Sequence, residues 1–426
     1  MDTAHLHQLF LECQAVSTDT RKISKNAMFF ALKGENFNGN AYAEEALKQG
    51  AKFAIVDEVE FQTSENIIFV KDCLKALQEL ATFHRFYLKT PIVALTGSNG
   101  KTTTKELINA VLSQKYKTTA TVGNLNNHIG VPLTLLSMTP DTELGIVEMG
   151  ANHQKEIEFL CSIAQPDFGL ITNYGKAHLE GFGGVAGIIK GKSEMYDYLK
   201  SHEKTAFVNA EDPIQMEKTE GINRFTFGNS NQDVPVDFKN ANPFVRLAYN
   251  GLEIQSQLIG DYNFTNIAFA VAMGHYFKVD KLSIKHAIES YVPSNNRSQI
   301  KILGTNKIIL DAYNANPTSM RAALLNLSRQ SGSKMAFLGD MFELGEDALK
   351  EHQNIEELAN SLDIEAITCI GKHFSEAATT SNKISHFKTF EAFKQATDLS
   401  NLNHKTILIK GSRGMAMERL LDLLPE

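Results

Sequence analysis

The stretch IVALTGSNGKTTTKEL, residues 92–107, determines how the rest of the chain is interpreted. Its first residues are mostly apolar and predict a buried strand, and KTTTKEL begins a pattern typical of a helix. The turn between them, GSNGKT at residues 97–102, contains two glycines. In such a turn the backbone N–H groups and the N-terminus of the next helix face an anion. The stretch therefore predicts a loop that binds the phosphates of a nucleotide.

Two side chains of this turn indicate how the phosphates are held. Lys101 supplies a positive charge for the terminal phosphates, and the hydroxyl of Thr102 suits Mg²⁺. Leu95 stands where the general phosphate-loop pattern has a glycine, so the loop departs from that pattern. The predicted nucleotide contacts are Gly97, Ser98, Asn99, Gly100, Lys101, Thr102 and Thr103.

Composition limits the class of protein. A length of 426 residues predicts about two or three domains, and 43% hydrophobic residues are enough for ordinary cores. The net charge of -7 provides no overall positive field for nucleic acid or anionic lipid. No basic signal segment and no apolar run of roughly 20 residues is found. The four scattered cysteines fit reduced thiols, so we expect a cytoplasmic protein without membrane insertion.

Strand and helix patterns alternate along the chain, which predicts an α/β protein. Breaks at KTP (89–91) and PSNNRS (293–298) divide it into three predicted domains. Residues 1–88 form a small N-terminal α/β domain, and residues 89–297 form a central domain of the P-loop ATPase type. Residues 298–426 form a Rossmann-like, doubly wound domain, expected to bind ligands beyond the carboxyl ends of its strands.

Polar residues follow several other predicted strands of the central domain. Glu148 ends the apolar string GIVE and could hold Mg²⁺, although acids at strand ends are common. His178 lies in a loop after another strand, where a lone histidine is usually solvated. Lys190 and Lys192 lie two apart on a predicted helix, so only one of them can face a site. Spacing alone does not choose between these lysines.

Asparagines mark two further positions. Asn263 and Asn266 precede an apolar helix and suit a purine edge or a ribose, although helix capping explains one of them. Asp311, Asn314 and Asn316 follow the strand IIL in the third domain. The strings FLGDMFELGE and IKGSRGM repeat this arrangement, which predicts a binding surface at one sheet edge.

Taken together, these strings resemble the Mur ligases, the ATP-dependent amide ligases of peptidoglycan assembly. The matching strings lie in all three predicted domains, in the family's order: TGSNGKTTTKE, GNLNNHIGVPLTLL, VEMGANHQKEI, ITNYGKAHLEGFGG, DAYNANPTSM, LGDMFELGE and IKGSRGMAMERLL. The shortened phosphate loop is the form that this family uses. NANP and GDMFELGE are similar to the member that joins D-alanyl-D-alanine to UDP-N-acetylmuramoyl-tripeptide.

The resemblance implies a role for each domain. The first binds the uridine end of the substrate, the second binds ATP and Mg²⁺, and the third closes over both and helps to hold the incoming amine. The substrate carboxylate attacks the γ-phosphate of ATP, and the amine then displaces phosphate from the acyl phosphate. Asp-Thr-Arg at 19–21 stands where the family usually has Asp-Ser-Arg.

The resemblance also implies roles for individual residues. The implied metal ligands, for two Mg²⁺ ions, are Thr102, Glu148, His178 and Lys192, and the implied catalytic residues are Lys101, Glu148, His178 and Lys192. Lys192 is expected to be carbamylated, because the family's modified lysine lies four residues before an aromatic residue, here Tyr196. Further nucleotide contacts are Asn263, Asn266, Arg297 and Asp311. The implied substrate-binding residues are Thr20, Arg21, Asn126, Asn127, Asn314, Asn316 and Arg413. A monomer is expected.

Several alternatives remain open at this point. A GTPase would need Asn-Lys-x-Asp, and the nearest string, NAED at 209–212, lacks the lysine. A sibling ligase, either the one that adds the third amino acid or a folylpolyglutamate synthase, is disfavoured by NANP. An unrelated P-loop kinase would not need the strings of the third domain. A non-catalytic nucleotide-binding protein would not need the set of Lys101, Glu148, His178 and Lys192.

Overall fold

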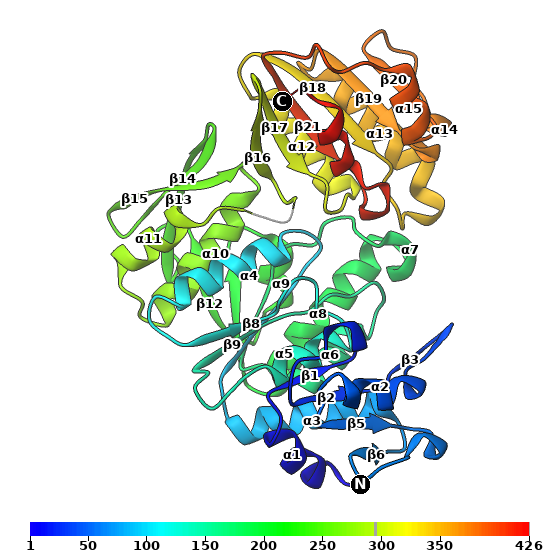
Figure 1. Cartoon of the computed structure of the whole chain (residues 1–426). Coiled ribbons are helices and arrows are strands. Elements are labelled where there is room, and N and C mark those ends of the chain that lie inside the picture. Colours follow the sequence, from blue (N-terminus) through cyan, green and yellow to red (C-terminus); the bar gives the residue numbers. More distant parts are fainter. Residues whose placement is uncertain (294–295, 426) are drawn as a thin grey trace.

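Three α/β units follow one another along the molecule in this computed structural model, which describes residues 1–293 and 296–425. The chain begins in the unit at one end and finishes in the unit at the other end (Figure 1). The predicted α/β class and the three-part architecture are confirmed. The domain limits stay a prediction, and Ser294 and Asn295 of the PSNNRS segment lie outside the described residues.

The N-terminal domain is built on a small parallel sheet with the order β1-β2-β5-β6. The strings AMFF and FAIV form its buried middle strands because all their side chains are apolar. Helix α3 begins after Asp72, whose carboxylate caps the Lys75 N–H, and ends at the left-handed Lys89. The elements are α1 (Thr3–Leu11), β1 (Ala15–Ser17), η1 (Thr20–Lys22), β2 (Ala27–Phe30), β3 (Lys33–Gly34), β4 (Phe37–Asn38), η2 (Gly39–Tyr42), α2 (Ala43–Lys48), β5 (Phe53–Val56), η3 (Val59–Phe61), β6 (Ile67–Phe69) and α3 (Cys73–Leu88).

The central domain has a nine-stranded sheet with the order β15-β14-β13-β12-β11-β10-β7-β9-β8. Strand β7 lies between β10 and β9, and all three run parallel, so the loop that follows β7 opens at the shared carboxyl edge. The last three strands in sequence form an antiparallel extension. The strands are β7 (Ile92–Thr96), β8 (Thr118–Ala120), β9 (Leu144–Glu148), β10 (Phe168–Ile171), β11 (Thr205–Asn209), β12 (Asn223–Gly228), β13 (Val234–Ala241), β14 (Phe244–Tyr249) and β15 (Leu252–Ile259). The helices are α4 (Lys101–Leu112), α5 (Gly130–Leu136), α6 (Glu156–Ala164), α7 (Leu179–Phe182), α8 (Val185–Ser201), α9 (Pro213–Lys218), α10 (Asn263–Tyr276) and α11 (Lys281–Ser290).

The C-terminal domain has a six-stranded sheet with the order β16-β17-β21-β18-β19-β20, parallel except for the edge strand β16. After Lys410 the chain forms two 3₁₀ segments, which are separated at Ala416, a residue with a left-handed φ of 47°. The strands are β16 (Gln299–Leu303), β17 (Asn306–Asp311), β18 (Ser333–Gly339), β19 (Ala366–Ile370), β20 (Ile384–Phe387) and β21 (Lys405–Lys410). The helical segments are α12 (Pro317–Ser328), η4 (Gly345–Asp347), α13 (Ala348–Ser361), α14 (Lys372–Ala377), α15 (Phe390–Ala396), η5 (Arg413–Met415) and η6 (Met417–Leu423).

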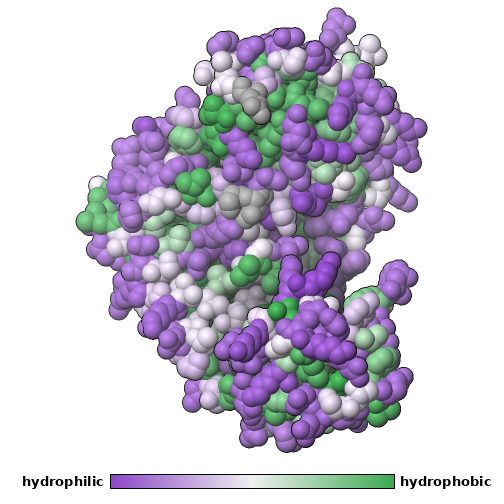
Figure 2. Space-filling model, viewed as in Figure 1, coloured by the Kyte–Doolittle hydropathy of each residue, from purple (hydrophilic) through white to green (hydrophobic). Residues whose placement is uncertain are grey.

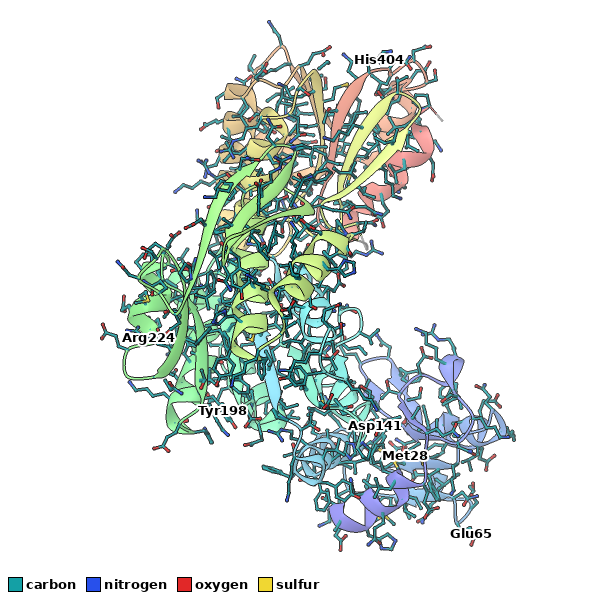
Figure 3. All side chains as sticks on the ribbon, turned by 90° about the vertical axis from the view of Figure 1, so that its left-hand side faces the viewer. Met28, Glu65, Asp141, Tyr198, Arg224 and His404 are labelled. Carbon is teal, nitrogen blue, oxygen red and sulfur yellow. The ribbon has the colours of Figure 1, made fainter. Side chains whose placement is uncertain are left out.

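The outer surface is mostly hydrophilic and is hollowed on the side where the N-terminal domain faces the rest of the molecule (Figure 2). After a turn of 90° the N-terminal domain projects to one side, with Glu65 and His404 at opposite ends (Figure 3). Within the described ranges, none of the helices combines the length and the apolar character that a membrane span needs.

Candidate active site

A cavity of about 910 Å³ lies where the central and C-terminal domains meet. Its wall combines the loop after β7 with the polar ends of β9, β17 and β21. Most of the predicted site residues line it: Ser98, Asn99, Gly100, Lys101, Thr102, Thr103, Asn126, Asn127, Glu148, His178, Asn263, Asn266, Arg297, Asp311, Asn314 and Asn316. Residues more than 200 positions apart in sequence therefore share one site, as the sequence predicts.

The phosphate loop depends on its glycines. Gly97 and Gly100 have φ of +143° and +79°, values that residues with a side chain rarely adopt. A Cβ atom on Gly100 would lie 2.5 Å from Asn266 Oδ1, and one on Gly97 would overlap Thr172 Oγ1. Both positions therefore lack room for a side chain.

The end of β10 holds the loop from behind. The Ser98 N–H donates to the Asn173 carbonyl (3.0 Å), and the Asn99 N–H donates to Asn173 Oδ1 (3.2 Å). The hydroxyl of Thr172 donates to the Asn99 carbonyl (2.6 Å). These bonds fix the loop before any ligand arrives, because the bonded residues directly follow β7 and β10, which are neighbouring strands of one sheet.

Lys101 begins α4 and folds back over its own loop. Its Nζ donates to the Gly97 carbonyl at 2.7 Å. Burial lowers the pKa of Lys101, and the carboxylate of Glu148 opposes this shift. The ammonium group is thus held at the phosphate loop with one replaceable carbonyl partner.

Glu148 ends β9 directly beside the loop, in register with Leu95. Asn126 Nδ2 donates to Glu148 Oε1 at 2.8 Å, and the Glu148 N–H donates to Thr121 Oγ1 at 3.0 Å. Glu148 is only 2% exposed, and its Oε2 has no hydrogen-bond partner among the described residues. An unpartnered buried carboxylate oxygen, lining the same cavity as the Thr102 hydroxyl, fits a hard cation such as Mg²⁺.

His178 lies immediately before α7, in the left-handed region. Its Nδ1 pairs with Glu343 Oε2 of the C-terminal domain, and this bond lowers the pKa of Glu343. Its Nε2 makes no hydrogen bond to the described part of the chain and can therefore take a second contact. A histidine that is bound to a carboxylate through one nitrogen has the usual arrangement of a metal-binding imidazole.

Asn263 and Asn266 line the cavity from the start of α10. Asn263 Nδ2 donates to the Ile259 carbonyl (2.8 Å), and Asn266 Nδ2 donates to Asn263 Oδ1 (2.8 Å). The hydroxyl of Thr104 donates to Asn266 Oδ1 (3.1 Å). Part of their hydrogen-bonding capacity therefore joins α10 to α4, beyond the capping role that the sequence allows.

The facing wall begins at Arg297, whose guanidinium lies 3.6 Å from the centre of the Tyr313 ring. Asp311 accepts from the Ser298 N–H (3.1 Å) and pairs with Lys410 Nζ (2.6 Å). The Lys410 side chain is 2% exposed and also donates to the Asn314 carbonyl (3.1 Å). The strand ends of β17 and β21 are thus joined by a buried ion pair.

Two amide side chains join the walls directly. Asn316 Oδ1 caps α12 by accepting from the Ser319 N–H (2.9 Å), while its Nδ2 donates to Asn99 Oδ1 of the phosphate loop (2.7 Å). Asn127 is a local cap as well, because its Oδ1 accepts from the Ile129 and Gly130 N–H groups.

Lys192 lies behind the cavity, whereas Lys190 is exposed on the same helix, α8. Lys192 is 1% exposed, its Nζ donates to the Ala151 carbonyl (3.0 Å), and it lies 4.8 Å from the centre of the Phe182 ring. Burial lowers the pKa of Lys192 well below its usual value, and the charge on Lys101 lowers it further. Ala151 itself lines the cavity, so one carbonyl separates this amine from the site.

The structure does not bring every predicted residue to the cavity. Thr20, Arg21 and Arg413 are absent from its described lining. Arg21 pairs with Asp19 (2.9 Å) with its side chain 86% exposed, and Arg413 pairs with Glu418 (2.7 Å). Gly97 contributes its carbonyl to Lys101 and does not line the cavity among the described residues.

Sequence reasoning also missed residues that the cavity contains. Lys410, Glu343 and Tyr313 lie within strings that the sequence marks, but no role follows from their residue types alone. A lysine at a strand end resembles a solvated lysine until its buried partner is known. The carboxylate of Glu343 has meaning only once His178 lies beside it.

Family models match all three parts of the chain. Residues 12–85 match the Mur ligase family catalytic domain, residues 95–274 the Mur ligase middle domain, and residues 296–413 the Mur ligase glutamate ligase domain. The UDP-N-acetylmuramoyl-tripeptide–D-alanyl-D-alanine ligase of Bacillus subtilis is 34% identical over 96% of this chain and 93% of its own length. The ligase of the same name from Escherichia coli is 34% identical over 97% and 94%.

Solved structures agree. A crystal structure of MurF from Acinetobacter baumannii superposes with a TM-score of 0.87 at 30% identity, covering 99% of this chain and 97% of that one. MurF from Thermotoga maritima, crystallised with ADP, gives a TM-score of 0.85 at 27% identity, with 97% of each chain covered. The resemblance first noted in the phosphate loop thus extends over the whole chain, which belongs to the Mur ligase family.

Proposed function

We propose that this chain is the ATP-dependent ligase that joins D-alanyl-D-alanine to UDP-N-acetylmuramoyl-tripeptide, forming the UDP-muramoyl-pentapeptide precursor of peptidoglycan. One observation carries the proposal. The phosphate loop and the polar strand ends of the C-terminal sheet line one cavity, in a chain 34% identical over 96% of its length to a ligase of that name.

The first step brings two anions together. The carboxylate of the UDP-linked substrate attacks the γ-phosphorus of ATP, the bond to the bridging oxygen breaks, and ADP leaves. Lys101 and the amides of the loop at 97–102 can neutralise and orient the phosphates, because they are held in place beforehand. Asn263, Asn266, Arg297 and Asp311 would hold the rest of the nucleotide.

Oxygen donors in the cavity suit Mg²⁺, which is a hard cation. Thr102, Glu148 and His178 would hold it, and the unpartnered Glu148 Oε2 is the atom that supports this assignment within the described chain. Bound Mg²⁺ would neutralise phosphate charge in the transferred group.

In the second step the amine of D-alanyl-D-alanine attacks the acyl carbon. The carbon–oxygen bond to phosphate breaks, and inorganic phosphate leaves. The C-terminal wall, with Asn314 and Asn316 after its strand β17, faces the phosphate loop and would help to hold this amine. Asn126 and Asn127 would contact the UDP-linked substrate. Thr20 and Arg21 would serve its uridine end, and Arg413 would have to leave Glu418 to reach a ligand.

We further propose that Lys192 is carbamylated. The neutral amine attacks CO₂, a nitrogen–carbon bond forms, and one proton leaves. Burial supports this step because it lowers the pKa of Lys192 and so favours the neutral amine. The resulting carbamate oxygen is the kind of ligand that Mg²⁺ prefers. Lys190, exposed on the same helix, has no such environment.

The proposed function also assigns a role to each domain. The N-terminal domain, proposed as residues 1–88, would bind the uridine end, and residues 89–297 would bind ATP. Residues 298–426 would close over both ligands. We propose a cytoplasmic location, because both ATP and the UDP-linked substrate are cytoplasmic metabolites, and we propose that the protein is a monomer.

Omission of single substrates tests the proposal. Purified protein with ATP, Mg²⁺, D-alanyl-D-alanine and UDP-N-acetylmuramoyl-tripeptide should release phosphate and yield the pentapeptide product by mass spectrometry. Leaving out either peptide substrate should abolish sustained phosphate release. Phosphate release that does not depend on D-alanyl-D-alanine, or that requires diaminopimelate, lysine or glutamate in its place, would instead identify another member of the family.

A further inference from the structure

Phe342 and Phe159 are large, partly exposed apolar side chains in the wall of the cavity, and Phe342 belongs to the wall of the C-terminal domain. It follows β18, lines the cavity and remains 40% exposed. Phosphates, ribose and carboxylates give such a ring little to bind, so its partner is either the adenine base of ATP or an apolar group of another substrate. An exposed aromatic ring inside a ligand cavity is typical of a site that receives an apolar group.

The C-terminal sheet holds the backbone of Phe342 firmly. Its N–H donates to Ser412 Oγ (2.9 Å), and Ser412 Oγ donates to the Ala315 carbonyl (3.4 Å). The Ser412 N–H donates to the Asp340 carbonyl (3.0 Å). Ser412 therefore ties together the loops that follow β17, β18 and β21.

A glycine leaves space for the ring. A Cβ atom on Gly414 would lie 2.9 Å from Phe342 Cε2, so the ring rests against the Gly414 backbone. Ala315, which is joined to Phe342 through Ser412, also lines the cavity. The Phe342 ring and the Ala315 methyl group thus belong to residues whose backbones are joined by the same Ser412 hydroxyl.

The neighbour of Phe342 locates it along the cavity. Glu343 pairs with His178, which we assign to the metal beside the transferred phosphoryl group. Because adjacent residues lie about 3.8 Å apart along the chain, Phe342 lies near the reacting end of the cavity, on the wall of the C-terminal domain.

We propose that Phe342 determines specificity for the incoming dipeptide by packing against the methyl group of its N-terminal D-alanine. The inference rests on the proposed function and adds a substrate contact to it. That alanine carries the attacking amine, so its methyl group is the apolar part of the dipeptide closest to the acyl phosphate. Packing a methyl group against an aromatic ring removes apolar surface from water.

The test combines a change in the enzyme with a change in the substrate. Steady-state rates would be measured for the wild type and Phe342→Ala with D-alanyl-D-alanine and with glycyl-D-alanine, which lacks only the N-terminal methyl group. The variant should raise the KM for D-alanyl-D-alanine about tenfold, the size expected for one buried apolar group. With glycyl-D-alanine the variant and the wild type should differ by less than about twofold, because the methyl partner is already missing.

Two further variants serve as controls. Phe342→Leu keeps an apolar side chain and should retain most of the preference for D-alanyl-D-alanine. Phe86→Ala removes a similarly exposed ring from α3 and should change no kinetic constant. KM values for ATP and for the UDP-linked substrate should stay constant in all variants.

Specific results would overturn the inference. Equal losses with both dipeptides would show that the ring only supports the loop, and a raised KM for ATP would place it against the nucleotide. Unchanged kinetics in Phe342→Ala would remove it from recognition altogether while leaving the proposed function intact. Only a wild-type enzyme that uses neither dipeptide would contradict the proposed function as well.

Discussion

The central domain has two junctions, and they are built differently. Toward the N-terminal domain, α3 buries Leu77 and Leu80 and packs on α5 and α6. Side chains of α3 also donate to backbone carbonyls, as Thr82 does to Ile163 (3.0 Å). Arg85 of α3 also pairs with Asp167 (2.6 Å), with its side chain 9% exposed. Toward the C-terminal domain, pairs between polar side chains are more numerous among the described residues: Asn316 to Asn99, Lys176 to Glu351, Arg329 to Asp261 and His178 to Glu343.

The difference indicates which domain moves. Apolar burial has no substitute in a ligand, and neither Thr82 nor Ile163 is among the described residues that line the cavity, so the N-terminal junction gains nothing by opening when ligands bind. Of the C-terminal pairs, Asn316–Asn99 and His178–Glu343 line the cavity, so their side chains can exchange partners for phosphate, metal or substrate. We therefore expect ligands to reposition the C-terminal domain against a fixed pair of other domains.

The largest expected effect concerns Lys101, which the central domain contributes to the wall of the cavity. Lys101→Ala should reduce turnover by about 10²-fold or more, because a preorganised charge on the transferred phosphates is lost. Phosphate release and pentapeptide formation would be measured together. Turnover within a few-fold of the wild type would mean that the cavity between the central and C-terminal domains is not the reaction site.

Lys192→Ala should also cause a severe loss of ligation, while ATP binding is largely kept. The buried amine is the proposed source of a carbamate, so short carboxylic acids should restore part of the activity by supplying an anionic oxygen. The exposed Lys190 on the same helix is the matched control, and Lys190→Ala should remain fully active. Wild-type activity in Lys192→Ala, together with a bare Lys192 amine in a crystal structure of the active protein with Mg²⁺ and nucleotide, would exclude the carbamate.

Closure should be visible by small-angle scattering. A non-hydrolysable ATP analogue together with the UDP-linked substrate should reduce the radius of gyration. Glu351→Gln removes the carboxylate that pairs with Lys176 (2.6 Å) and should change the analogue concentration needed by about two- to fivefold, as expected for a partly exposed pair. An unchanged scattering profile at saturating ligands would contradict the idea that this junction opens and closes.

The smallest effect concerns the fixed junction. His7 Nε2 and His84 Nδ1 lie 3.0 Å apart, and His84 Nε2 bonds to the Met138 carbonyl of the central domain (3.0 Å). Burial lowers the pKa of both histidines. A histidine in the unfolded chain has a pKa near 6.5, so just below this pH the unfolded chain binds more protons than the folded pair does. Stability should be fully present above about pH 6.5 and decline as the pH falls below it.

Thermal unfolding between about pH 7.5 and about pH 5.5 would measure this decline. His7→Gln keeps a hydrogen-bond donor but has no titrating group. The fall in melting temperature over this pH range should therefore be smaller by a few degrees than in the wild type. ATP and Mg²⁺ should leave the difference between the two proteins unchanged, because they bind at the other junction. A slope that depends on ligand would mean that the two junctions are coupled.

The sequence predicts the site residues at the strand ends of the central domain better than it predicts the positions of exposed arginines. Loop 97–102 and Glu148 follow from local patterns, since a strand, a turn and a helix carry their own geometry. The direction of an exposed arginine does not, because Arg21 and Arg413 are held by the nearby acids Asp19 and Glu418. The pairing of Lys410 with Asp311 joins positions 99 apart, which no local pattern contains.

The choice between Lys190 and Lys192 shows the same limit. Helical spacing places them on different faces but does not say which face is buried. That depends on the packing of α8 against α6 and β10, which is a tertiary property. The family resemblance chooses Lys192, and the structure buries the same residue.

Asn316 limits what evolution can accept at one position. Serine, threonine and aspartate would start α12 almost as well, because each offers an oxygen to the helix. Among the residues that cap well, only asparagine also carries an amide N–H₂ that can donate to Asn99 while its oxygen stays on the helix. A substitution that a stability screen would score as harmless would therefore separate the phosphate loop from the domain that must follow it. Natural variation at this residue should be far narrower than helix capping alone requires.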